Sequence, residues 1–307
     1  GIATISEFGV VLMLFVIGLE LSPQRLWVMR RSVFGTGIAQ VLASGLAIGL
    51  VAYWLFGFNG KAAFVVGGSL ALSSTAFGLQ ILAERKEAAS AYGRHVFAVL
   101  LFQDLVAIPL IAALPLLAAS SASHVDLLGV LRTIGVIVGV VVGGRYLLRA
   151  VFRFVAKADS VEVSTATALL VVMGVAWLME LAGLSATLGA FLAGVLLADS
   201  EYRHEMESNI EPFKGLLLGL FFISVGMSMD LSLLWHSPGL VLTLLALLLA
   251  LKSALLWPLG RWLCGLNRSD TPRLLVLLAA GGEFAFVVLR LATEQRLLSV
   301  AQRDLLM

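Results

Sequence analysis

The sequence predicts an all-α polytopic membrane protein, and three observations carry this prediction. Hydrophobic residues make up 60% of the 307 residues and charged residues 13%, against about 45–50% and about 25% in ordinary soluble domains. The apolar residues come in blocks of about 17 to 28, and about 20 apolar residues span the hydrocarbon core of a bilayer as a helix. Lysines and arginines gather in alternate loops between the blocks, which is the pattern of cytoplasmic loops.

The apolar blocks predict about ten membrane segments within one transmembrane transport domain that spans residues 1–307. Each block is bounded by a short polar stretch, as a membrane-spanning helix requires. The chain begins with GIATISEF and ends with AQRDLLM, which resembles the entrance to another helix, so we expect a piece of a longer protein. The expected segments are 6–22, 33–56, 61–82, 94–118, 126–156, 162–182, 184–199, 213–229, 238–264 and 272–294.

Positive charge orients these segments, because lysine and arginine in short loops stay on the cytoplasmic side. The loops after the odd-numbered segments carry most of this charge, which predicts that residue 1 lies outside. Arg290, Arg296 and Arg303 disagree, since they would lie at or beyond the outer end of the tenth segment. The net charge of +2 reflects loop residues, so we expect no nucleic-acid partner. The orienting residues are Arg25, Arg30, Arg31, Arg85, Lys86, Arg94, Arg145, Arg149, Arg153, Lys157, Arg203, Lys214, Arg261, Arg268 and Arg273.

The third and tenth segments are predicted to unwind near the middle of the membrane. The third contains Gly67-Gly68 followed by SST at 73–75, and the tenth contains Gly281-Gly282-Glu283. Glycine costs about 1 kcal/mol in a helix interior, and hydroxyl groups offer the backbone alternative hydrogen bonds. Two interrupted segments in corresponding halves of a chain are typical of inverted-repeat transporters. The alternative is that small residues allow close helix packing.

A few ionisable residues lie deep within apolar runs. Lys252 lies in the ninth segment, Asp104 in the fourth and Glu283 in the tenth. A charge at the bilayer centre costs about 2.5 to 3.5 kcal/mol on insertion scales, so such residues need partners or a water-filled cavity. An ion pair between Asp104 and Lys252 would offset part of both costs, either in a transport site or as a structural pin between helices. Glu283 is suited to the positive N-terminal ends of unwound helices.

The sequence FQD in the fourth segment predicts an ion site. Gln103 and Asp104 lie in the segment that follows the first predicted broken helix, and Pro109 lies five residues beyond Asp104. A carboxylate beside free carbonyl and hydroxyl groups binds either a small cation or a proton. One group that holds either, but not both, is sufficient for exchange.

Four motifs together resemble one family of transporters. LFQDLVAIP, LALSSTA, the stretch from Leu192 to Ser228 and GGEFAF are similar to the membrane domain of the bacterial Kef glutathione-gated potassium efflux systems. The resemblance covers nearly all of the chain. It implies an NhaA- and NapA-like inverted-repeat antiporter fold with two discontinuous crossing helices, in which a core domain moves against a dimeric scaffold. It also implies a multi-pass protein of the bacterial inner membrane, a homodimer, that exports potassium as protons enter.

The resemblance assigns roles to individual residues. Asp104 matches the ion- and proton-binding aspartate, Gln103 stands where sodium-exporting relatives have a first aspartate, and Lys252 matches their membrane lysine. We expect potassium at Asp104 and Gln103, with Ser74 and Thr75 as further neutral oxygens. The acidic loop His204, Glu205, Glu207, Asn209 and Glu211 matches a contact with the regulatory domain, although Asn209 replaces an expected acidic residue.

The resemblance also implies parts that lie beyond these residues. They are two helices before residue 1, a last core helix after Met307 and a C-terminal nucleotide-binding regulatory domain. Glutathione and its adducts would gate the transporter through that domain. The expected partners are the bilayer and an ancillary flavodoxin-like subunit. K⁺ and H⁺ are the transported ions, and we expect no cofactor within the fragment and no enzyme activity.

Other functions remain open from the residues alone. A sodium/proton antiporter would use the same carboxylate, and a channel-like conduit would pass ions that a pH gradient does not drive. An intramembrane aspartyl protease needs two carboxylates on facing helices, with Glu283 as the candidate partner of Asp104. A membrane scaffold would show no pH-dependent ion movement.

Overall fold

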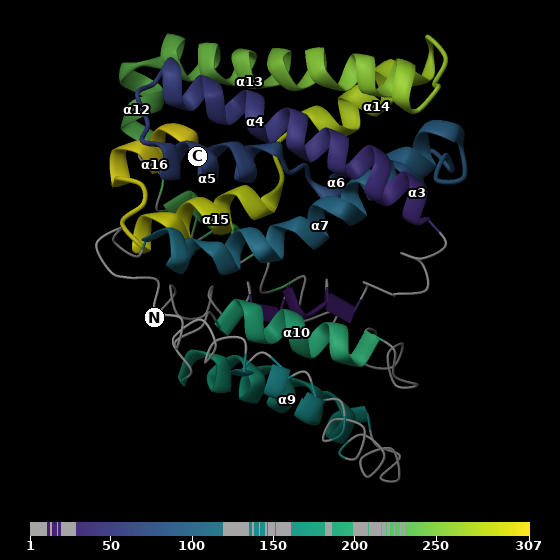
Figure 1. Ribbon diagram of the computed structural model, residues 1–307, viewed down its shortest axis with the longest axis vertical. Coiled ribbons are helices and arrows are strands. Elements are labelled where there is room, and N and C mark those ends of the chain that lie inside the picture. The colour runs from purple at the N-terminus through teal and green to yellow at the C-terminus, as the bar shows by residue number, and fades with distance from the viewer. Residues whose placement is uncertain are drawn as a thin grey trace. The chain divides into compact units, whose positions relative to one another are not determined.

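The structure is a computed structural model that describes residues 29–118, 161–181, 186–198 and 231–307, together with scattered helical residues within 11–19, 135–151 and 208–229. All regular secondary structure in these ranges is helical (Figure 1). The chain divides into two compact units, each described by itself here. Unit 1 comprises Gly1–Arg25 and Ala119–Ser228, and unit 2 comprises Leu26–Ala118 and Met229–Met307.

Unit 2 combines helices from two distant parts of the chain. The earlier part includes two helices separated by a three-residue break, and so does the later part. The earlier helices are α3 (Arg30–Ser32), the π-helix η1 (Val33–Gly37), α4 (Ile38–Trp54), α5 (Gly60–Ala71), α6 (Thr75–Glu84) and α7 (Ala91–Ala118). The later ones are α12 (Leu231–His236), α13 (Pro238–Pro258), the π-helix η3 (Leu259–Leu263), α14 (Asp270–Ala279), α15 (Glu283–Glu294) and α16 (Val300–Leu306).

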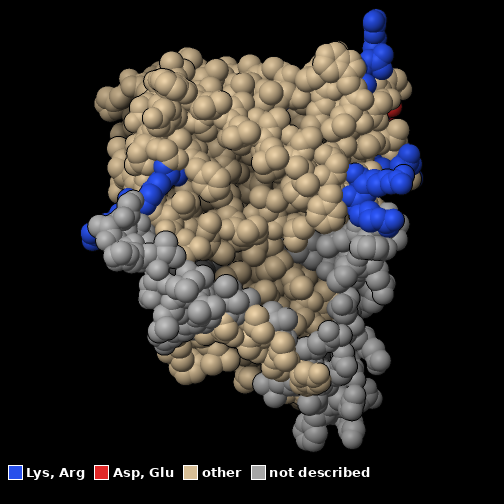
Figure 2. Space-filling view, in the orientation of Figure 1, with Lys and Arg blue, Asp and Glu red and all other residues tan. Residues whose placement is uncertain are grey.

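Four stretches of the described chain are long and apolar enough to cross a membrane. They are Arg30–Trp54, Ala91–Ala118, Pro238–Leu263 and Asp270–Glu294. Shorter apolar helices cover Gly60–Ala71, Thr165–Leu181 and Leu188–Ala198. In the space-filling view, the lysine and arginine side chains gather toward the margins of the upper face, which is otherwise almost uncharged (Figure 2). Large apolar side chains such as Leu46, Leu242 and Val276 are exposed, as contact with lipid requires.

The described helices agree closely with the expected segments. Helices occupy 30–54, 60–84, 91–118, 161–181, 186–198, 238–263 and 270–294, where the sequence predicts segments at 33–56, 61–82, 94–118, 162–182, 184–199, 238–264 and 272–294. The segments expected at 6–22, 126–156 and 213–229 lie largely outside the described residues. The count of ten is therefore not confirmed.

The first break lies at the serine stretch that helped to predict it and not at the glycine pair before that stretch. Helix α5 continues through Gly67 and Gly68 and ends at Ala71. A Cβ atom at Gly67 would lie 2.2 Å from the carbonyl oxygen of Gly45 on α4, so this glycine allows α4 and α5 to pack closely. The chain unwinds later, at Leu72–Ser74. In the tenth segment the break does contain its glycines, since it spans Ala280–Gly282.

Local capping explains where several helices begin. The Asn59 side chain accepts a hydrogen bond from Ala62 N at 2.8 Å, which starts α5, and Pro238 occupies the first turn of α13. Ser299 and Gln302 form a reciprocal capping box at the start of α16. The sequence AQRDLLM was expected to begin another helix, and α16 covers its first six residues.

Unit 1 has a core of its own. Helices α9 (Val161–Leu181) and α10 (Ala186–Ala198) pack with helical residues from 11–19 around buried side chains that include Phe15, Leu19 and Val172. Gly18 and Gly194 approach so closely that a Cβ atom at Gly194 would lie 2.1 Å from the Phe15 carbonyl oxygen. Small residues at the contact points thus bring these helices together.

Candidate functional site

The two breaks in unit 2 lie against each other. Gly282 N donates a hydrogen bond to the carbonyl oxygen of Leu72 at 3.2 Å, and Ser73 Oγ donates to the carbonyl oxygen of Leu278 at 2.7 Å. Leu72 and Ala280, which end α5 and α14, have nearly identical extended conformations, with φ of −69° and −65° and ψ of 145° and 148°. Both helices that the sequence predicts to be interrupted are therefore discontinuous, and their breaks cross.

Lys252 binds the crossing point. Its side chain is fully buried, and Nζ donates to the carbonyl oxygen of Leu72 at 3.3 Å, to that of Ala280 at 3.2 Å and to Ser73 Oγ at 3.3 Å. These carbonyls follow the C-terminal ends of α5 and α14, where the helix dipole is negative. The sequence raised an ion pair between Lys252 and Asp104. Instead, the ammonium group joins the two breaks, because unwound backbone supplies acceptors that Asp104 would otherwise have to provide.

The carboxylate of Asp104 lies beside the start of α6. Asp104 is only 5% exposed, and its Oδ1 accepts a hydrogen bond from Thr75 Oγ1 at 2.9 Å. Thr75 is the first residue of α6, so the acid is close to the positive end of that half-helix. Helix α7 continues without interruption through Pro109. Asp104 is thus held on a continuous helix against a broken one.

Glu283 has the corresponding place on the second broken helix. It is the first residue of α15 and is half-buried. Each half-helix N-terminus at the crossing therefore has a carboxylate nearby, and the two half-helix C-terminal ends share one ammonium group. Opposite charges at these helix ends explain how unwound helices are tolerated in an apolar setting.

Gln103 connects the fourth segment to the first break. Its Oε1 accepts a hydrogen bond from Ser73 N at 2.8 Å. Its Nε2 donates to Gln40 Oε1 at 2.7 Å, to Ser73 Oγ at 3.2 Å and to the carbonyl oxygen of Ala71 at 3.3 Å. Gln103 is only 1% exposed. The residue next to the candidate ion-binding acid thus satisfies backbone groups that the break leaves without helical partners.

The two hydroxyl residues proposed as ion ligands differ in their contacts. Ser74 Oγ accepts a hydrogen bond from Phe77 N at 3.3 Å and caps α6, whereas Thr75 contacts Asp104 directly. Both side chains are half-buried. The ligand roles of Ser74, Thr75 and Gln103 stay predictions.

Sequence reasoning missed two residues of this site. Ser73 bridges both breaks, and Gln40 of α4 contacts Gln103. Gln40 carries an amide side chain within a long apolar run. A search of apolar runs for amide side chains as well as charged ones would have found it. Ser73 cannot be separated from Ser74 by sequence, because only the fold decides which hydroxyl faces the second break.

The residues of the expected regulatory loop lie outside the described residues. They are His204, Glu205, Glu207, Asn209 and Glu211.

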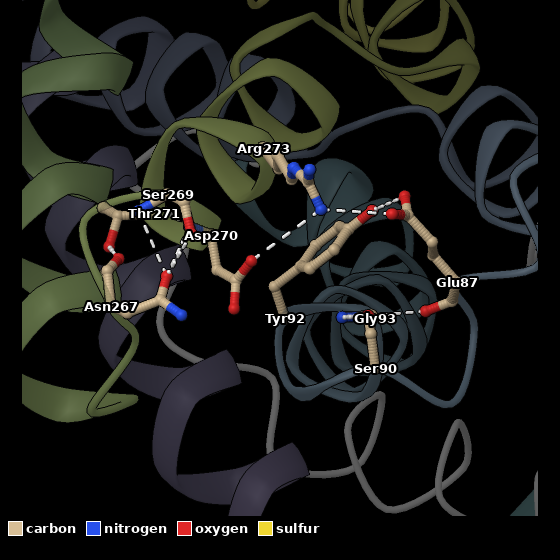
Figure 3. A network of polar contacts seen from close by, with 9 residues as sticks. All are labelled: Glu87, Ser90, Tyr92, Gly93, Asn267, Ser269, Asp270, Thr271 and Arg273. Atoms are coloured by element: carbon tan, nitrogen blue, oxygen red, sulfur yellow. Dashed lines mark hydrogen bonds and ion pairs between the residues drawn. The ribbon is translucent and has the colours of Figure 1, made fainter.

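A second polar cluster lies one half-helix away, where α14 begins (Figure 3). Arg273 Nη1 lies 3.1 Å from Glu87 Oε1 and 3.9 Å from Asp270 Oδ1, and its guanidinium group stacks over the Tyr92 ring. The Tyr92 hydroxyl donates to Glu87. The loops after the third and ninth segments therefore meet, which confirms that they lie on the same side, as the distribution of lysine and arginine predicts.

Comparison with known proteins identifies the family. The family model for the transmembrane region of sodium/hydrogen exchangers matches residues 1–305. Among solved structures, the sodium proton antiporter MjNhaP1 from Methanocaldococcus jannaschii matches with a TM-score of 0.65 and 16% sequence identity, over 98% of this chain and 79% of that chain. The likeness to that structure shows a shared antiporter fold. With the family match over nearly its whole length, two crossed discontinuous helices and a buried aspartate beside them, this chain belongs to the sodium/hydrogen exchanger family and is a membrane cation:proton antiporter.

Proposed function

We propose that Asp104 is the residue that binds cation and proton in turn, and that the transported cation is potassium. The observation that carries the proposal is the position of Asp104, the one carboxylate among the buried residues that the structure describes. Its carboxylate lies beside Thr75 at the first break. A carboxylate beside a hydroxyl group offers hard oxygen ligands to a monovalent cation, and protonation removes the charge that holds that cation.

Potassium is proposed as the cation because the site has one acid beside neutral oxygens. Gln103 replaces a second carboxylate, so the electric field at the site is weaker than that of an aspartate pair, which favours a large and weakly hydrated ion. Ser74 and Thr75 are the proposed further oxygen ligands. The resemblance of LFQDLVAIP and of the stretch up to Ser228 to the Kef systems supports the same choice.

The proposed role of Lys252 is structural. Because its ammonium group is engaged with both breaks, we propose that it remains bound there during transport. Exchange would then be one potassium ion for one proton, since Asp104 alone changes its protonation.

The proposal is tested by proton flux in proteoliposomes that hold the full-length protein. An imposed outward or inward K⁺ gradient should drive proton movement in the wild type. Asp104→Asn should abolish it, whereas the matched Asp270→Asn, at the start of α14 and away from the crossing, should retain it. Normal exchange in Asp104→Asn would refute the assignment of the acid.

The same assay separates the rival functions. Coupling to Na⁺ and not K⁺ would make the protein a sodium/proton antiporter. Ion flux that a pH gradient does not drive would indicate a channel-like conduit. The absence of any cation-driven proton movement in the wild type would contradict the proposed transport altogether.

We also propose that the transporter acts as a homodimer in a bacterial inner membrane and is gated by glutathione. Regulation would pass from a nucleotide-binding domain, with or without a flavodoxin-like subunit, to the loop that contains Glu205, Glu207 and Glu211. The support is the resemblance of this loop to that of the Kef systems. In full-length protein, glutathione should inhibit and glutathione adducts should activate K⁺-driven flux. Flux that neither compound changes would contradict this regulation.

A further inference from the structure

A buried amide on α4 is the feature from which this inference starts. Gln40 and Ser44 are each 1% exposed and lie one turn apart in the apolar helix α4. An amide transferred from water to an apolar interior is unfavourable unless its hydrogen bonds are made. Neither residue is among the proposed ion ligands.

The hydrogen bonds of Gln40 are directed at the first break and at Gln103. Gln40 Nε2 donates to the carbonyl oxygen of Ala71 at 3.1 Å and to Ser44 Oγ at 3.2 Å. Gln40 Oε1 accepts from Gln103 Nε2 at 2.7 Å. The Ala71 carbonyl can only accept, so it requires the amino group of Gln40 on its side. The oxygen of Gln40 is thereby turned toward Gln103.

This arrangement determines the orientation of the Gln103 amide. Gln103 Nε2 faces Gln40 Oε1 and the Ala71 carbonyl, and Gln103 Oε1 faces Ser73 N. A flipped amide would place its oxygen against two other oxygens and its amino group against an N–H group. Because an amide oxygen has two lone pairs, Gln103 Oε1 can accept from Ser73 N and still offer a lone pair to a cation in the proposed site.

The arrangement extends to the acid. Gln103 precedes Asp104 on α7, and Ser73 lies two residues before Thr75, whose hydroxyl donates to Asp104 at 2.9 Å. The hydrogen bond from Ser73 N to Gln103 therefore also fixes the position of the Thr75 hydroxyl, which contacts the Asp104 carboxylate. Gln40 on α4 is thus linked to Asp104 through three hydrogen bonds, which are Gln40–Gln103, Gln103–Ser73 and Thr75–Asp104.

We propose that Gln40 is a positioning residue that determines cation preference by orienting the Gln103 amide. This rests on the proposed function, in which Asp104 and Gln103 hold the cation. Without Gln40, the Gln103 oxygen leaves its place for part of the time, and the site loses a neutral ligand. Potassium, the larger ion, needs more oxygen ligands than sodium, so its binding suffers more.

The test compares Gln40→Met with Ser44→Ala in the full-length protein. Gln40→Met removes the nearest of the three acceptors of Gln103 Nε2, whereas Ser44→Ala removes only the bond from Gln40 to Ser44. Gln40→Met should raise the KM for K⁺ about fivefold, equivalent to about 1 kcal/mol, with the KM for Na⁺ changed less than about twofold. Ser44→Ala should leave the ratio of the two KM values unchanged. A general loss of stability would lower the amount of active protein without changing this ratio.

A second measurement does not depend on transport. Deuterium uptake by the segment Leu72–Ser74 should increase in Gln40→Met and not in Ser44→Ala, because Ser73 N loses its fixed acceptor. An unchanged uptake, or a KM ratio within about twofold of the wild type, overturns the role of Gln40. If the wild type shows no cation-driven flux, the proposed function fails, while deuterium uptake still decides whether Gln40 positions the break.

A second variant covers the case in which Gln40→Met does not fold. A buried protonated glutamate offers both an acceptor and an O–H donor, so Gln40→Glu should preserve the wild-type deuterium uptake over Leu72–Ser74 and the preference for K⁺. Increased uptake in Gln40→Glu would contradict the proposed orientation of Gln103.

Discussion

Gly282 N and the carbonyl oxygen of Leu72 are joined by a 3.2 Å hydrogen bond, so the two broken helices meet backbone to backbone. The contact leaves no room for a side chain, because a Cβ atom at Gly282 would lie 2.5 Å from the Ser73 carbonyl oxygen. The neighbouring Gly281 has open space in the same position. The crossing of the two breaks therefore requires a glycine at Gly282 and not at Gly281.

This asymmetry predicts different effects of alanine at the two glycines. Gly282→Ala should force the breaks apart and abolish K⁺-driven proton flux, with a lower melting temperature in detergent. Gly281→Ala should behave nearly as the wild type, since no atom lies within 4 Å of its added Cβ. Equal effects of the two substitutions would contradict the contact between Gly282 and Ser73.

Replacement of Lys252 should destabilise the crossing. In Lys252→Met the carbonyl oxygen of Ala280 loses its donor, while that of Leu72 keeps Gly282 N. One buried carbonyl left unpaired costs about 1 to 3 kcal/mol. We expect a lower melting temperature for the purified protein than for the matched Lys61→Met, where the lysine is exposed. A melting temperature at or above that of the wild type would show that burial of the ammonium group outweighs its hydrogen bonds.

The two adjacent serines of the first break should differ in the same assay. Ser73→Ala removes the donor to the Leu278 carbonyl and an acceptor for Lys252, and both of those partners are in the second half of the chain. Ser74→Ala removes only a cap of α6, at a cost of about 0.5 to 2 kcal/mol. Melting curves should rank Ser73→Ala as less stable. The reverse order would contradict the bridging role of Ser73.

Cys264 should react slowly with alkylating reagents. It follows the last residue of η3, and burial raises the pKa of its thiol to about 11. Because only the thiolate is nucleophilic, the thiol stays protonated near neutral pH, and its thiolate fraction is roughly 300-fold below that of an ordinary cysteine with a pKa of about 8.5. Alkylation at Cys264, followed by mass spectrometry, should accelerate about tenfold per pH unit between pH 7.5 and 9.5. A fast rate at pH 7.5 would mean that the thiol is more exposed than the structure shows.

The sequence predicted the placement of charge better than the pairing of charge. Asp104 and Lys252 stand out because a charge in an apolar run is rare, and both are buried beside a break. The structure does not pair Asp104 with Lys252. The sequence alone does not show that unwound backbone supplies acceptors for the Lys252 ammonium group. Gly67, which the sequence offered either as part of a break or as a close-packing residue, packs against Gly45.

The sequence by itself determined that the chain is a helical membrane protein and indicated which two of its described segments are interrupted. Composition and the length of apolar runs decide these properties, because the bilayer acts on each segment separately. Only the tertiary structure decided that Ser73 bridges the breaks, that Lys252 binds both, and that Gln40 orients Gln103. These contacts join residues 28 to 205 positions apart, and hydrogen-bond directions across such separations depend on how the helices pack.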